Sequence, residues 1–448
     1  MVKNLTVGNP VNVILSFTIP LFIGNLFQQS YNIVDTLIVG RTIGIDALAA
    51  VGSTGSINFL ILGFINGFGI GAAVLTSQRF GAGDMEGVRK SFAATIIISI
   101  GLSIVMTIIS FFGARPLLEF MRTPPEIIDS AYSYIIIIFL GIPTAMFFNL
   151  FANVMRAVGD SRTPLYFLAI AFTLKIILNL VFILVLKTGL GGVALTTLIA
   201  QFVCGLLCLI FINKKMPLLK LTKKDWHFNK GEISKHLKLA LPVGFQMSII
   251  AIGTISVTYA LNQLGTYAVA AYASATKIDI LATLILFSFG GAMTTYSAQN
   301  FGANKPERIR KGITHISIIA GIYCFIMALV FIFSGHFFPS LFLGRDSPET
   351  LSMARMYLII CSSSYIFLAL LFILRQSLLG LGDSITPTIA GIMELAMRIF
   401  AAIVLGRAFG FIGICFANPL AWVGAFIPLV IVFFIRMKKL TTQPAEKV

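Results

Sequence analysis

The strongest constraint on the fold is a series of apolar stretches, each long enough to cross a lipid bilayer. A transmembrane helix needs about 20 predominantly apolar residues, and the chain holds twelve such stretches. They are 12–39, 47–77, 91–113, 127–157, 163–187, 190–213, 236–262, 268–298, 312–334, 350–380, 386–406 and 410–436. The sequence therefore predicts an all-α integral membrane protein with twelve transmembrane helices.

The two halves of the chain carry the same landmarks in the same order. SQRFGAGDMEGVRKS (77–91) matches AQNFGANKPERIRKG (298–312), and RAVGDSRTP (156–164) matches LGLGDSITP (379–387). Because six helices per half is an even number, both halves enter the membrane from the same side, so they are parallel repeats. We expect two pseudo-symmetric six-helix lobes around a central cleft, an arrangement suited to alternating access.

The longest polar segment separates the two repeats. It runs over 213–238, and its basic part is expected to be a cytoplasmic linker. The domain prediction is thus an N-terminal lobe over 1–213, the linker over 214–235 and a C-terminal lobe over 236–448. We expect a monomer, because each chain already supplies two lobes.

The net charge of +16 is distributed unevenly over the two sides of the predicted membrane protein. We count 23 Lys and Arg at span ends on the side of both termini and the linker, Arg375 among them, and 7 on the opposite side. Basic residues accumulate on the cytoplasmic side of membrane proteins, so both termini should be cytoplasmic in a multi-pass protein of the plasma membrane. The basic residues form no soluble face with interleaved aromatics, so nucleic acid is not an expected partner.

Three of the 17 acidic residues lie well inside predicted spans: Asp35, Asp279 and Glu394. An ionised group near the bilayer centre costs at least about 2.5–3.5 kcal/mol. Such residues must face the protein interior or a wet cavity, and they are candidates for function.

Asp35 ends a row of polar residues in the first predicted span. Asn25, Gln28, Asn32 and Asp35 are spaced three, four and three residues apart, which places them on one helix face. We take the three amides as candidate cavity residues, and a structural polar seam between helices is the alternative. Pro20 removes a backbone donor and permits a kink in this helix.

Lys175 and Asn179 lie four residues apart on one face of the fifth span. Lys175 is an intramembrane cation that needs an anion, and Asp35 is the only intramembrane carboxylate in its half. We therefore hypothesise that the two side chains interact; the alternative is that Lys175 reaches a backbone carbonyl or an interface. Asn153, in the fourth span, is a further candidate cavity residue.

The C-terminal half carries its own intramembrane charges. Glu394 and Arg398 are spaced to pair within one helix, and Lys277 and Asp279 lie in the eighth span. We expect these four residues to form a charge network, either structural or involved in ion coupling.

Several classes of function lack support in the sequence. The five Cys and four His form no metal-ligand pattern, and no nucleophile motif or glycine-rich phosphate loop is present. We therefore expect no enzyme activity, no metal and no cofactor. A channel or receptor stays open, although the two-lobed repeat favours a transporter.

The combination of motifs resembles the multidrug and toxic compound extrusion (MATE) family over essentially the whole chain. The resemblance rests on IPLFIGNLFQQSYNIVDTLIVGR (19–41), the QRFGAGD and QNFGAN loops, and the paired GDSRTP and GDSITP. The early aspartate, KID and MELAMR are most similar to the branch named for a DNA-damage-inducible protein. The other branch carries acids in spans seven and ten, where this chain offers Gln246 and Arg375.

The resemblance implies export of cationic or amphipathic compounds in exchange for inward-moving H⁺ or Na⁺. It implies that Asp35 is the ion-coupling residue, that Pro20 helps to bend the first helix, and that Thr197 helps to ligate an ion. The branch often has Asn and then Asp in helix five, where this chain has Lys175 and Asn179.

This departure from the branch pattern favours H⁺ over Na⁺ as the coupling ion. A sodium site needs several neutral or anionic oxygens, and the ammonium of Lys175 would repel Na⁺. The alternative function is a lipid-linked sugar flippase of the same superfamily, because Lys175, Lys277 and Arg398 would suit a pyrophosphate.

Overall fold

The computed structural model describes residues 3–226, 230–334, 337–343 and 347–442, and these residues form helices and turns with no β-strand. The helices of the first half are α1 (Pro10–Thr42), α2 (Ile45–Gly81), α3 (Met85–Phe120), α4 (Pro125–Leu140), α5 (Ile142–Ala157), α6 (Arg162–Leu180), η1 (Val181–Val185), α7 (Gly189–Lys215), η2 (Pro217–Leu219) and η3 (Lys223–Trp226). Those of the second half are α8 (Lys230–Asn262), α9 (Thr266–Gly302), α10 (Pro306–Ser334), α11 (Phe337–Leu343), α12 (Pro348–Ser363), α13 (Tyr365–Gly380), α14 (Ile385–Phe400), η4 (Ala401–Leu405), α15 (Gly406–Phe409), α16 (Phe411–Cys415) and α17 (Ala417–Thr442). The predicted all-α fold is confirmed.

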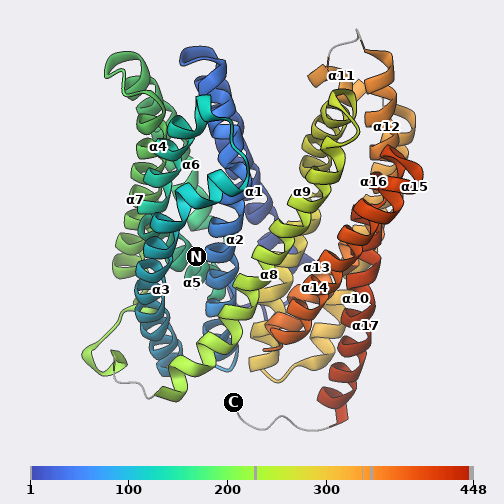
Figure 1. The fold of residues 1–448 in the computed structure, drawn as a ribbon. Coiled ribbons are helices and arrows are strands. Elements are labelled where there is room, and N and C mark those ends of the chain that lie inside the picture. The colour runs from blue at the N-terminus through green and yellow to red at the C-terminus, as the bar shows by residue number, and fades with distance from the viewer. Residues whose placement is uncertain (1–2, 227–229, 335–336, 344–346, 443–448) are drawn as a thin grey trace. The chain divides into compact units, whose positions relative to one another are not determined.

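The chain divides into two compact units. Unit 1 comprises Met1–Asn4 and Ile19–Ser248, and unit 2 comprises Leu5–Thr18 and Ile249–Val448. Helices α1 and α8 each contribute residues to both units. Within unit 1, α3, α4 and α7 lie side by side, as Figure 1 shows in blue-green to green. The predicted lobe boundaries at the linker stay a prediction.

Ten helices within the described ranges are long and apolar enough to cross a membrane, and two bent helix pairs bring the number to twelve. The first pair is α4 and α5, bent by 44°, and the second is α12 and α13, bent by 50°. The predicted spans 127–157 and 350–380 are therefore two helices each. In the first pair, Gly141 ends α4 and Pro143 occupies the first turn of α5, where its missing N–H costs nothing.

The long helices expose one apolar face and bury another. On α10, Ile318, Ile322 and Phe325 are more than half exposed, whereas Ile316 and Ala320 are fully buried. Exposed apolar side chains on one face of a membrane helix face the lipid, so the buried face of α10 packs inside unit 2.

The repeated GDSxTP motif starts a helix in each unit. Gly159 adopts a positive φ of 87°, a conformation that glycine reaches without strain. Asp160 then accepts hydrogen bonds from the backbone N–H of Thr163 at 3.0 Å and from its hydroxyl at 2.7 Å. Asp383 accepts the equivalent bonds from Thr386 at 3.0 and 2.8 Å before α14. The motif is thus a helix-capping device, because it satisfies a free N–H group of the first turn.

The glycines of α2 allow close contact with α8 inside unit 1. A Cβ atom added at Gly67 would lie 2.5 Å from the carbonyl oxygen of Val243, and one added at Gly71 would lie 2.7 Å from Cα of Ala240. Small residues spaced by four permit such an approach of two backbones in membranes.

Candidate functional site

Asp35 and Lys175 form a buried ion pair in unit 1. The Nζ atom of Lys175 lies 2.5 Å from Oδ2 of Asp35, and the two side chains are 4% and 11% exposed respectively. Asp35 comes from α1 and Lys175 from α6, so helices far apart in the sequence supply the two charges. The hypothesis that these residues interact is confirmed.

Two neutral polar residues extend the ion pair. The Asn179 amide donates a hydrogen bond to Oδ1 of Asp35 at 2.9 Å. The hydroxyl of Thr196, on α7, donates in turn to Oδ1 of Asn179. Asn179 and Thr196 are fully buried, and the Thr196 bond orients the amide so that its N–H groups face the carboxylate. Both oxygens of Asp35 are therefore engaged by donors from α6.

Thr197 occupies a different face of α7 from the one that contacts this network. Its hydroxyl donates to the carbonyl oxygen of Val193 in its own helix at 3.1 Å, and the residue is half-buried. The neighbouring Thr196 contacts Asn179 instead. Thr196 rather than Thr197 therefore contacts the network in this structure, because one residue rotates a helix position by about 100°. The role of Thr197 as an ion ligand stays a prediction.

An aromatic group that sequence reasoning missed covers the ion pair. Nζ of Lys175 lies 4.7 Å from the centre of the Tyr31 ring, within the range of a cation–π contact. Tyr31 packs edge-on against Phe172, with ring centres 5.0 Å apart. Phe27 also packs against Phe172, with ring centres 5.6 Å apart. The spacing of Phe27 and Tyr31 before Asp35 was the available signal, since residues four apart share a helix face.

The other expected residues of α1 have different environments. Asn25 is half-buried and interacts with other groups of the protein, and Gln28 is exposed. The side chain of Asn32 lies outside the described residues. Pro20 is buried inside α1, which continues as an α-helix past it, so bending at Pro20 stays a prediction.

Asn153 is buried on α5 and contacts a cation. The Nη1 group of Arg156 donates to its Oδ1 atom at 3.2 Å. Its Nδ2 atom has no hydrogen-bond partner among the described residues and points at Gly69, where an added Cβ would lie 2.8 Å away. No hydrogen bond between described residues joins Asn153 to Asp35, so its role as a cavity residue stays a prediction.

Unit 2 contains a second buried ion cluster with an unexpected member. Glu394 accepts a hydrogen bond from Arg375 at 2.7 Å and one from Arg398 at 2.9 Å. From the sequence, Arg375 is expected among the charges at span ends, but its side chain is only 4% exposed. The described contacts thus place Arg375, rather than Lys277, beside the Glu394–Arg398 pair.

Asp279 is buried apart from that cluster. It is 6% exposed, and Oδ1 accepts a hydrogen bond from the Tyr365 hydroxyl at 2.6 Å. Lys277, two residues earlier on α9, is exposed. The described contacts therefore do not join the four expected residues into one network. Glu394 and Arg398 are paired, whereas Asp279 and Lys277 lie on different sides of α9, because residues two apart point to different sides of a helix.

A π-helical segment follows the key cation in each unit. Segment η1 begins six residues after Lys175, and η4 begins three residues after Arg398. Single-turn π segments inside helices are frequent at functional sites. The two units therefore share a backbone irregularity shortly after these cations, although Lys175 pairs with one carboxylate and Arg398 shares Glu394 with Arg375.

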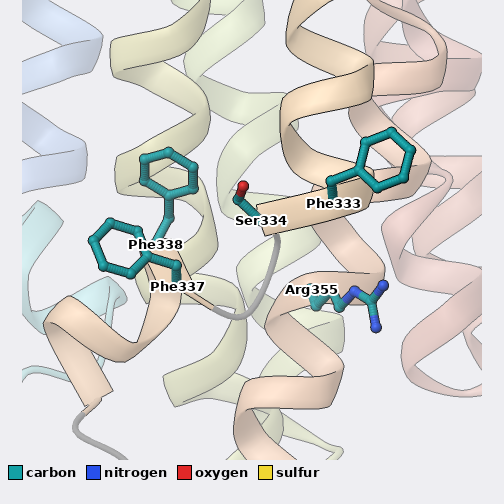
Figure 2. A pocket seen from close by; sticks show the side chains of 5 residues that line it. All are labelled: Phe333, Ser334, Phe337, Phe338 and Arg355. Atoms are coloured by element: carbon teal, nitrogen blue, oxygen red, sulfur yellow. The ribbon is translucent and has the colours of Figure 1, made fainter.

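A hollow of about 670 Å³ lies at one end of unit 2. Figure 2 shows the residues that line it, which are Phe333, Ser334, Phe337, Phe338 and Arg355. The Arg355 guanidinium donates to the carbonyl oxygen of Ile332 at 3.1 Å. The hollow shares no residue with either buried carboxylate cluster.

Thr196 and Thr197 provide a matched pair of variants. Thr196→Val is expected to destabilise the protein by about 1–3 kcal/mol, because it leaves Oδ1 of Asn179 buried without its donor. Thr197→Val should be close to wild type in stability, since its hydroxyl donates only within its own helix. Thermal unfolding of the two purified variants measures both effects. Equal effects of the two changes would contradict the assignment of Thr196 to the network.

Comparison with known proteins shows one family across both repeats. A family model described as MatE matches residues 20–181 and 242–404. The probable multidrug resistance protein YoeA of Bacillus subtilis (strain 168) is 30% identical over 390 residues, which cover 85% of this chain and 83% of that protein. The multidrug export protein MepA of Staphylococcus haemolyticus (strain JCSC1435) is 24% identical over 436 residues, 96% of this chain and 95% of its own.

Solved structures share the fold over nearly the whole chain. A MOP superfamily transporter from Pyrococcus furiosus aligns with a TM-score of 0.90 and 21% identity over 98% of both chains. A MATE family transporter in an outward-facing conformation aligns with a TM-score of 0.89 and 22% identity over 99% of both chains. At 21% and 22% identity, these two structures support the shared fold alone. The family is shown by the family model and by the 30% identity to YoeA: the chain belongs to the multidrug and toxic compound extrusion (MATE) family, whose members are membrane transporters and not enzymes.

Proposed function

We propose that this chain exports small amphipathic cations in exchange for inward-moving protons. The relatives YoeA and MepA are named for multidrug resistance and multidrug export, which supports drug-like cargo. We further propose that the protein acts as a monomer in the plasma membrane with both termini in the cytoplasm, as the distribution of Lys and Arg indicates.

The observation that carries this proposal is the state of the Asp35 carboxylate. It is buried, and donors from Lys175 and Asn179 engage its two oxygens at 2.5 and 2.9 Å. A buried ion pair is stable only while both charges are present. Any event that neutralises Asp35 leaves Lys175 buried without its anion, so one proton is enough to destabilise this arrangement.

The same geometry supports H⁺ rather than Na⁺ as the coupling ion. Sodium would need oxygen ligands, but the Asp35 oxygens face an ammonium and an amide N–H, and Oδ1 of Asn179 faces the Thr196 hydroxyl. A sodium ion would have to displace the ammonium and turn the amide. A proton needs only to bind one carboxylate oxygen.

These contacts suggest a sequence of steps in the transport cycle. Asp35 takes up a proton from outside and becomes neutral, and Lys175 loses its counter-ion. The contact between α1 and α6 then weakens, and α1 rearranges about Pro20 to release the cargo. Release of the proton to the cytoplasm restores the ion pair.

Transport by purified protein in liposomes tests the coupling ion directly. With ethidium as the probe, a pH gradient at zero sodium is expected to drive transport, and a sodium gradient at equal pH is expected to have no effect. Addition of an ionophore that collapses the pH gradient should stop transport, and protein-free liposomes give the background. Sodium-driven transport that ignores the pH gradient would overturn the proposal.

The flippase alternative has less support from the described contacts. The sequence offered three cations that would suit a pyrophosphate, but Lys175 is paired with Asp35, and Arg398 shares the Glu394 carboxylate with Arg375. Lys277 is exposed. Translocation of a lipid-linked oligosaccharide by the same liposomes, without ethidium transport, would favour the flippase.

A further inference from the structure

The three buried carboxylates that lie inside predicted spans, Asp35, Asp279 and Glu394, differ in the positive charge around them. Asp35 contacts one ammonium group, and Glu394 contacts two guanidinium groups. Asp279 has no ion pair among the described residues, and its side chain accepts one hydrogen bond, from a phenol. A carboxylate that is buried without a counter-cation is unstable as an anion and tends to bind a proton.

Among the described residues, the group that contacts the Asp279 side chain is a phenol, the Tyr365 hydroxyl of α13. Three further neutral groups lie within electrostatic range, namely Tyr272 on its own helix and Tyr357 and Cys361 on α12. Tyr357 in turn accepts a hydrogen bond from the Asn418 amide of α17 at 3.0 Å. None of these side chains can neutralise a carboxylate.

The basic residues on the neighbouring helices are directed elsewhere. On α13 and α14, Arg375 and Arg398 both bind Glu394. On α12, Arg355 binds the carbonyl oxygen of Ile332, and on α9, Lys277 is exposed. Asp279 is therefore left as a carboxylate with no cation at contact distance in the described part of unit 2.

We propose that Asp279 is a second proton-binding site, located within unit 2 and loaded during the transport cycle. The part of this inference that concerns transport rests on the proposed proton antiport. Two opposing effects make the site switchable. Burial favours the neutral carboxyl, while the 2.6 Å hydrogen bond from Tyr365 has the length of a charge-assisted bond and favours the carboxylate.

The position of Tyr365 connects the protonation of Asp279 with the shape of unit 2. Tyr365 is the first residue of α13, and it follows the 50° bend between α12 and α13. Its hydroxyl ties this bend to α9. Protonation of Asp279 converts a strong hydrogen bond to an anion into a weaker hydrogen bond to a neutral group. The angle between α12 and α13 can then change more easily.

The chain contains a natural reporter for this site. Trp422 is buried on α17, and its ring centre lies 6.1 Å from that of Tyr365. The only other tryptophan of the sequence is Trp226, which is 43% exposed in unit 1. In a Trp226→Phe background, tryptophan fluorescence therefore reports on the surroundings of Tyr365 and Asp279.

The test is a pH titration of Trp422 fluorescence in the purified full-length protein. We expect one pH-dependent transition of the fluorescence, and we expect Asp279→Asn to remove it. Tyr365→Phe keeps the carboxyl and should move the midpoint without removing the transition. Glu307→Gln, which changes an exposed acid of the same unit, should leave the transition unchanged.

Ethidium transport in liposomes provides the second measurement. Under a pH gradient, Asp279→Asn is expected to transport at least fivefold more slowly than the Trp226→Phe parent. A missing transition in the parent, a transition that survives Asp279→Asn, or transport by Asp279→Asn at the parental rate would overturn the inference. A parent that ignores pH gradients but keeps an Asp279-dependent transition would contradict the proposed antiport and support the proton site.

Discussion

Asp35→Asn is expected to abolish proton-driven efflux while leaving the protein in the membrane. The variant keeps the size and hydrogen-bonding capacity of the side chain but removes its charge and its ability to take up a proton. We expect ethidium efflux under a pH gradient to fall by at least tenfold, which corresponds to only about 1.4 kcal/mol. Efflux by proteoliposomes at matched protein content measures the effect.

Two controls separate a coupling defect from a folding defect. Asp46→Asn changes an exposed acid at the start of α2 in the same unit and should transport normally. The double variant Asp35→Asn with Lys175→Gln removes both members of the ion pair, so no buried charge is left uncompensated. We expect this double variant to fold and still fail to respond to a pH gradient. Full proton-driven efflux by Asp35→Asn would rule out Asp35 as the coupling residue.

Glu394→Gln is expected to cause the largest loss of stability among single substitutions in unit 2. Glu394 forms ion pairs with both Arg375 and Arg398, and all three side chains are less than 10% exposed. Removing one partner from a buried ion pair typically costs about 3–5 kcal/mol, because the remaining charge stays buried without compensation. Unfolding of the purified protein, followed by its intrinsic fluorescence, measures the change in stability.

The controls for Glu394→Gln use the same charge change elsewhere and the removal of the whole cluster. Glu307→Gln alters an exposed acid on α10 and should have little effect, because exposed ion pairs contribute about 0–1 kcal/mol. Replacement of Glu394, Arg375 and Arg398 together by Met removes every buried charge, and we expect it to be far more stable than the single variant. A single variant as stable as wild type would show that the arginines find other compensation.

The ion pair of unit 1 was predictable because intramembrane charges are rare. An intramembrane Lys needs an anion, and the N-terminal half offers one intramembrane carboxylate, so Lys175 and Asp35 could be matched by elimination. The spacing of Lys175 and Asn179 already placed both on one helix face. The same reasoning failed for Glu394, since Arg375 lies five residues from the end of α13 and was interpreted as an end charge.

Thr196 and Tyr365 could not be identified from sequence, for a geometric reason. Adjacent residues differ in direction by about 100° around a helix, and the rotation of α7 against α6 decides whether Thr196 or Thr197 faces Asn179. Tyr365 reaches Asp279 because α13 begins immediately after a bend at Ser364. No spacing rule relates two residues that are 86 positions apart.

The sequence by itself determined that this chain spans a membrane as two repeats of six helices and that a few charges must be buried. Both conclusions follow from local quantities, namely the hydropathy of each stretch and the cost of placing a charge in lipid. Only the tertiary structure decided which buried charge meets which partner. Within the described residues, Asp35 pairs with one cation, Glu394 with two and Asp279 with none, because pairing depends on how the helices rotate and pack against each other.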